Sequence, residues 1–167
     1  MILSKHSSES GTTLIEAMVA ACTSAMFLGS LFAMNMTGIK AIRTAREAAC
    51  ASQVLQQRVE AMRIANWHQV TDANWVKNNL LSTNAAGSDV LRNISETITL
   101  VPYGSSTTGN TQLLRTNGTA SIVNQTALLK EGALKVIWTV SYRGGINSQP
   151  VSRQAVAILA QGGVAKW

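Results

Sequence analysis

The chain has 167 residues, of which 46% are apolar and only 13% are charged, whereas soluble domains usually carry ~25% charged residues. This length fits one domain with an appended segment, and the low share of charge excludes long charged tails and coiled coils built on surface ion pairs. The formal net charge is +6, but Lys and Arg are scattered without any basic run, which argues against a nucleic-acid-binding groove.

An uncharged apolar segment follows a short polar leader at the N-terminus. Residues 1–11 are polar, and the 23 residues from Ala17 to Ile39 contain no charged side chain. About 20 such residues cross the ~30 Å hydrocarbon core of a bilayer, so the segment is predicted to be a transmembrane helix. It is long for the apolar region of a cleaved signal peptide, and a plain anchor does not explain Glu16 at its edge, because a carboxylate is costly there unless it has a partner.

The residues around this carboxylate carry a resemblance to a known family. The hexapeptide Gly11-Thr12-Thr13-Leu14-Ile15-Glu16, followed by an apolar span, resembles the class III signal of type IV pilin-like proteins. The resemblance implies that a prepilin peptidase cuts between Gly11 and Thr12 and that Thr12 is then N-methylated, although the family usually has Phe at this position. It also implies that Glu16 is needed for assembly into a filament, where it pairs with the new amine of a neighbouring subunit.

The resemblance also implies partners and a location. The partners are the peptidase, other pilins or pseudopilins, an assembly platform and membrane lipid, and the C-terminal domain is periplasmic until the subunit leaves the inner membrane for a pilus or pseudopilus. The flanking charges predict the opposite orientation, with the C-terminal side in the cytoplasm, because positive charge favours the cytoplasmic side. The leader has only Lys5, whereas Lys40, Arg43 and Arg46 follow the span. The family topology is preferred here, since the leader must meet a peptidase on the cytoplasmic face.

The helical pattern continues beyond the membrane segment. Residues 40–66 contain no Pro or Gly, so a transmembrane half (12–39) and an amphipathic half (40–66) are predicted to form one helix. Two ion pairs along it are expected, Glu47 with Arg43 and Glu60 with Arg63. The face predicted to pack on the domain consists of Ile42, Ala45, Ala49, Ser52, Leu55, Val59 and Met62.

The remainder of the chain is predicted to form a connecting loop followed by a sheet domain. Residues 67–93 are predicted to be this loop, with a short helix near residues 75–81 and with Trp67 and Trp75 against the sheet. In residues 94–167 the apolar period changes to two, and Asn117-Gly118 is typical of a hairpin turn. The predicted fold class is therefore α+β. The resemblance implies that it takes the pilin-like form of this class, a long N-terminal helix packed on a small antiparallel sheet. The expected strands are 94–101, 112–116, 120–124, 134–143 and 151–160.

The sequence offers little for catalysis or for a cofactor. His6 lies in the leader, and His68 has only Asp72 at helical spacing, which is usual for a surface pair. No hydrolase, zinc or nucleotide motif occurs, so no enzyme activity, cofactor or metal is expected. Cys22 and Cys50 are predicted to lie ~42 Å apart on one helix, too far for a disulfide. Two alternatives to a filament subunit stay open: a single-pass anchored surface binding domain and a minor pilin that captures DNA.

Overall fold

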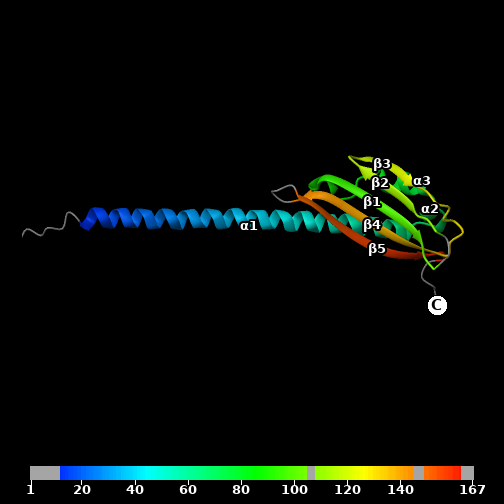
Figure 1. Ribbon diagram of the computed structural model, residues 1–167, viewed down its shortest axis with the longest axis horizontal. Helices are drawn as coiled ribbons and strands as arrows, with labels where there is room; N and C mark the ends of the chain where they lie inside the picture. Colours follow the sequence, from blue (N-terminus) through cyan, green and yellow to red (C-terminus); the bar gives the residue numbers. More distant parts are fainter. Residues whose placement is uncertain (1–11, 105–107, 145–148, 163–167) are drawn as a thin grey trace, which may run out of the picture. The chain divides into compact units, whose positions relative to one another are not determined.

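A single long helix leads into short helices and a five-stranded antiparallel sheet in the computed structural model of the protein (Figure 1). The structure describes residues 12–104, 108–144 and 149–162. The chain divides into two compact units, with the boundary between Ile42 and Arg43 inside the long helix α1 (Thr12–Ile64). A long N-terminal helix and an antiparallel sheet confirm the predicted α+β class, and the pilin-like form of that class stays a prediction.

The first unit is helical throughout its described part, residues 12–42. It contains no proline, and Ala, Leu and Met, which are strong helix formers, are frequent in it. Every side chain described in this stretch, from Thr13 to Ile42, is exposed, including large apolar ones such as Phe27 and Met34. No other part of the described chain therefore covers this apolar surface.

The second unit is built on one sheet with the order β3-β2-β1-β4-β5, antiparallel throughout. The central strand β1 is followed by β2 and β3 on one side, and the chain then crosses to form β4 and β5 on the other. Asn117 and Gly118 both have positive φ, at 52° and 81°, so the predicted hairpin turn between β2 and β3 is confirmed. The strands are β1 (Arg92–Pro102), β2 (Thr111–Thr116), β3 (Thr119–Asn124), β4 (Ala133–Gly144) and β5 (Gln149–Ala160).

One face of this sheet packs against the second half of α1. Alternate residues of β4 are buried there, as their period of two predicts, and Trp138 lies at the centre with none of its surface exposed. Ala51, Val54 and Met62 of α1 belong to the same core. This packing confirms the predicted antiparallel sheet on a helix. The buried residues of β4 are Leu134, Val136, Trp138, Val140 and Tyr142.

The buried face of α1 differs from the predicted one in its first part. Ile42 is 71% exposed, and Ala45 and Ala49 are exposed as well, so the predicted face is wrong there. The true face is turned by about one residue, or ~100° around the helix, and includes two charged side chains that a search for apolar residues passes over. The buried residues are Glu47, Ala51, Val54, Leu55, Arg58 and Met62.

The segment between α1 and the sheet is more helical than the sequence predicts. It forms α2 (Trp67–Thr71), α3 (Ala73–Trp75), a π-helical turn (Val76–Leu81) and a 3-10 turn (Ser88–Val90). Asp72 separates α2 from α3, and its carboxylate accepts a hydrogen bond from the Asn74 amide at 2.9 Å. Trp67 and Trp75 pack on the core, as expected, and the Trp67 indole donates to the Leu129 carbonyl at 3.3 Å.

Candidate functional site

The first turns of α1 hold the residues that the sequence singles out for processing and assembly. Gly11 lies outside the described residues, and Thr12 is the first residue of α1. The predicted cleavage bond therefore directly precedes the described part of α1. Glu16 follows Thr12 by four residues in the helix, a rise of ~6 Å, and its side chain is exposed.

The Glu16 carboxylate has no cation near it in the part of the chain that the structure describes. The ion pairs found there join other residues, and the next cation along α1 is Lys40, 24 residues further on, a rise of ~36 Å. The first turn of α1 contains no acidic residue, and Glu16 lies beyond it, where the attraction of the helix dipole has faded. Neither an internal ion pair nor the helix end explains this carboxylate.

The segment after Glu16 has the length and composition of a membrane span. Among the described residues, one helix is long and apolar enough to cross a bilayer, and its most apolar window is not buried at all. Three hydroxyl groups within it donate back to carbonyls of the preceding turn, which satisfies them without water. These bonds run from Thr23 to Val19 at 2.9 Å, from Ser30 to Phe27 at 2.7 Å and from Thr37 to Ala33 at 2.9 Å.

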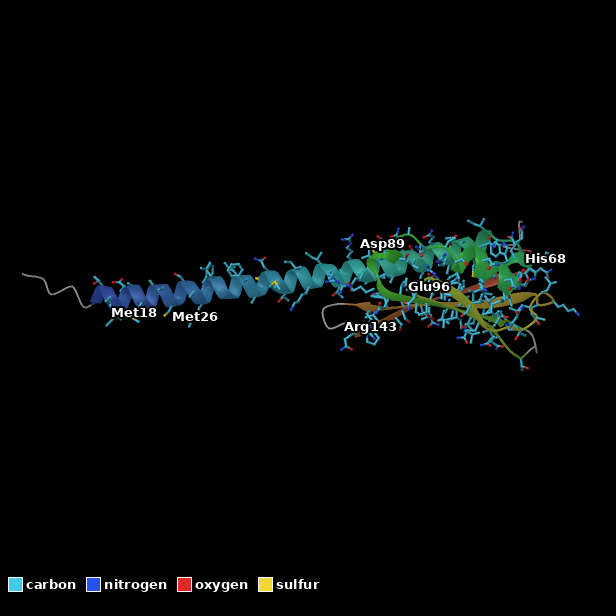
Figure 2. The ribbon with its side chains drawn as sticks, turned by 90° about the horizontal axis from the view of Figure 1, so that it is seen from above. Met18, Met26, His68, Asp89, Glu96 and Arg143 are labelled. Atoms are coloured by element: carbon cyan, nitrogen blue, oxygen red, sulfur yellow. The ribbon has the colours of Figure 1, made fainter. Side chains whose placement is uncertain are left out.

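The second unit holds a buried ion cluster that the sequence analysis did not identify. Glu96, on β1 in the second unit (Figure 2), has no exposed surface. It accepts hydrogen bonds from two arginines that are themselves 4% exposed. Arg58 of α1 binds it with two nitrogens, Nε at 2.9 Å and Nη2 at 3.0 Å. Arg115 lies directly opposite on β2 and donates from Nη1 at 2.7 Å.

The two guanidinium groups extend the cluster to the end of the π-helical turn and to the residues that follow it. Arg58 donates to the carbonyl oxygens of Leu80 and Thr83, the latter at 2.7 Å, and its guanidinium carbon lies 5.8 Å from the centre of the Trp138 ring. Arg115 donates to the Asn84 side chain. The cluster thus ties α1, two strands and the segment 80–84 together.

This geometry makes the cluster a structural clip. Both Glu96 oxygens accept from guanidinium donors and none of the residue is exposed, so a substrate has no access to the carboxylate. Breaking such a buried pair is costly, whereas its net contribution relative to an apolar core is small. The cluster therefore fixes how α1 sits on the sheet within the second unit.

The sequence does indicate that Glu96 is buried and needs a partner, but a search for apolar residues overlooks this. Glu96 lies in register with Ile98 and Leu100, on the buried face of a strand that was predicted correctly. A charge on such a face requires a partner. The sequence does not name that partner, because Arg115 depends on the pairing of β1 with β2 and Arg58 on the docking of the helix.

The other candidate residues are not brought together. His68 is exposed on α2, at the end of the second unit opposite Asp89 and Arg143 (Figure 2), and the Asp72 carboxylate is used by the Asn74 amide. Cys22 and Cys50 are both free and both on α1, as predicted. Within the described residues, no three His, Cys, Asp or Glu side chains are grouped so as to hold a metal ion.

Comparisons with protein-family models, with curated proteins and with solved structures find no match to this chain. The functional argument therefore rests on its own residues and on the resemblance of its N-terminal hexapeptide.

Proposed function

We propose that the protein is a type IV pilin-like subunit, a minor pilin of a pilus or a pseudopilin of a type II secretion system, which assembles through α1. The observation that carries this proposal is Glu16, an exposed carboxylate without a cation in the described chain, placed directly before 23 uncharged residues. In a membrane or in a dry bundle of helices, such a charge persists only with a partner. The partner must therefore come from outside the described part of the chain.

Cleavage between Gly11 and Thr12 supplies a cation of the right kind. It creates an α-amine at Thr12, which stays positively charged when methylated once. Within one helix, the amine and Glu16 lie one turn apart, and between staggered helices the amine of an incoming subunit meets the Glu16 of its neighbour. A pair of this kind sets the register between subunits more than it adds to stability.

The proposed life cycle follows from this pairing. The uncharged segment holds the subunit in the inner membrane, with the leader exposed to a prepilin peptidase and the second unit in the periplasm. After the cut, an assembly platform passes α1 into a bundle of like helices formed with other pilins or pseudopilins. The sheet domain then lies on the outside of the filament, and the subunit performs no catalysis.

The mature N-terminus tests this proposal. The protein is isolated from its native cells, and its N-terminal peptide is identified by mass spectrometry. We expect the peptide to begin at Thr12, with one added methyl group on the amine. A chain that still begins at Met1 would indicate a single-pass anchored domain instead, and a chain that has lost residues 12–39 would indicate an exported protein; either result overturns the proposal.

A further inference from the structure

We infer that the second unit carries a basic surface at the end where its part of α1 begins. This surface binds the anionic headgroups of the membrane from which α1 emerges. The surface consists of Arg43 and Arg46 on α1, Arg92 at the start of β1 and Arg143 at the end of β4. All four side chains are exposed. The inference requires α1 to span a membrane, but it does not require cleavage or filament assembly.

Two of these arginines form a pair that the chain itself does not explain. Arg92 and Arg143 are directly opposite each other in the antiparallel register of β1 and β4. Like charges in this position repel and destabilise a sheet. Neither arginine forms an ion pair with any residue in the described ranges, and the adjoining residues 145–148 carry no charge in the sequence. An external anion would relieve this repulsion.

The same end of the sheet lies beside the first turns of α1 in this unit. A Cβ atom built on Gly144, the residue after Arg143, would lie 3.2 Å from a carboxylate oxygen of Glu47. A Cβ built on Gly87 would lie 3.6 Å from that of Cys50, so the segment leading into Arg92 also meets this part of the helix. Arg143 and Asp89 are seen together at this end in Figure 2.

Charge at this end is unbalanced even though two acids are present. Glu47 pairs with Arg43 at 3.1 Å and is buried, and Asp89 is the other acid. Four arginines against these two acids leave an excess of two positive charges, and Lys40 precedes them on α1.

The position of these charges along the helix favours a lipid surface over a nucleic acid. Arg43 and Arg46 follow Ile39, the last residue of the uncharged segment, by four and seven residues, which corresponds to a rise of ~6 and ~10 Å. The headgroup region extends ~5–8 Å beyond the hydrocarbon core on each side. Anionic headgroups therefore lie within reach, and each Lys or Arg near such a surface strengthens binding about fivefold.

Lipid binding by the full-length chain tests the inference. The protein is purified in a neutral detergent, and retention of phosphatidylglycerol and of phosphatidylcholine is compared by native mass spectrometry. We expect phosphatidylglycerol to be retained preferentially. The variant Arg92→Gln/Arg143→Gln should lose about fivefold in affinity for each charge removed, without a fall in its melting temperature, because the repulsion between the two arginines is also removed.

A matched variant controls for total charge. Arg63→Gln/Lys130→Gln removes two exposed cations from other parts of the domain and should keep the preference for phosphatidylglycerol. Equal retention of the two lipids by the wild type, or an equal loss in both double variants, overturns the inference. Binding of a DNA duplex at 0.15 M salt that depends on Arg92 and Arg143, without any lipid preference, would assign the surface to nucleic acid and also overturns it.

Discussion

At the scale of single residues, two glutamates on this chain have opposite surroundings. Glu16 is exposed and has no cation beside it in the described ranges, whereas Glu96 is buried between two guanidinium groups. A buried carboxylate with both partners in place is satisfied and serves the fold. A carboxylate next to an apolar segment, without a partner in the described residues, is what we propose to be a site for another molecule. The contrast separates the residue that we assign to assembly from the one that we assign to stability.

The Glu96 cluster gives a residue-scale prediction for stability. Glu96→Ala leaves two buried guanidinium groups without their carboxylate, so the free energy of unfolding should fall by about 3–5 kcal/mol. The measurement is denaturant unfolding of the full-length chain in detergent, followed by tryptophan fluorescence, to which the buried Trp138 contributes. Glu60→Ala is the control, because it removes only an exposed pair with Arg63 and should cost less than ~1 kcal/mol. Equal effects of the two substitutions would show that Glu96 is not the centre of a clip.

At the scale of elements, the helix α1 carries its only backbone weak points inside the membrane segment. Gly29 and Gly38 lie there, and a Cβ atom built on either would meet nothing within 4 Å. Alanine therefore fits at both positions, and it favours a helix by about 1 kcal/mol per site over glycine. Because this segment contains no proline, any local unwinding on assembly has to use these glycines.

The double variant Gly29→Ala/Gly38→Ala tests for such unwinding. Membrane insertion should be unchanged, and incorporation into filaments should fall if α1 must open at these glycines. Amide hydrogen exchange in filaments of the wild type should show faster exchange around both glycines than in the adjacent turns. Uniform protection along α1, together with normal incorporation of the variant, would exclude unwinding.

Most elements of the fold could be predicted from the sequence, because their signals are local. The period of two in β4, the Asn117-Gly118 turn and the absence of helix breakers along α1 each depend on neighbouring residues only. The predicted helix ends at Asn66 and the observed one at Ile64. The helical turn Val76–Leu81 lies where a short helix near residues 75–81 was predicted, but α2, α3 and the 3-10 turn were missed, because segments of three to five residues are too short for a hydrophobic period to emerge.

The residues on the buried face of α1 were predicted less accurately than the elements themselves, and the reason is physical. Glu47 and Arg58 belong to that face, and charged side chains are buried only where partners from distant segments meet them. The partners of Arg58 come from β1 and from residues 80–83, at least 22 positions away. The processing residues Gly11 and Thr12 and the assembly residue Glu16, in contrast, are identified from sequence alone, and their roles stay predictions.

At the scale of the whole molecule, the chain combines a unit that exposes all of its described apolar side chains with a unit that has a closed core. The described residues of the first form a helix whose side chains are all exposed, and large apolar surfaces of this kind mark sites of contact with a membrane or with other proteins. The second is held by the core around Trp138 and by the Glu96 clip. A subunit that is stored in a membrane and later packed into a bundle requires both properties.

The central claim is that Glu16 receives an amine from another subunit during assembly. Its most direct test is co-assembly of Glu16→Ala with wild-type filaments in native cells, measured as the amount of variant in the membrane fraction and in the sheared filament fraction. Glu60→Ala, which changes an exposed acid on the same helix, serves as the matched control. We expect Glu16→Ala to reach the membrane at the wild-type level and to be depleted in filaments by tenfold or more, about 1.4 kcal/mol of lost pairing, while Glu60→Ala is normal in both fractions. Normal incorporation of Glu16→Ala would contradict the claim.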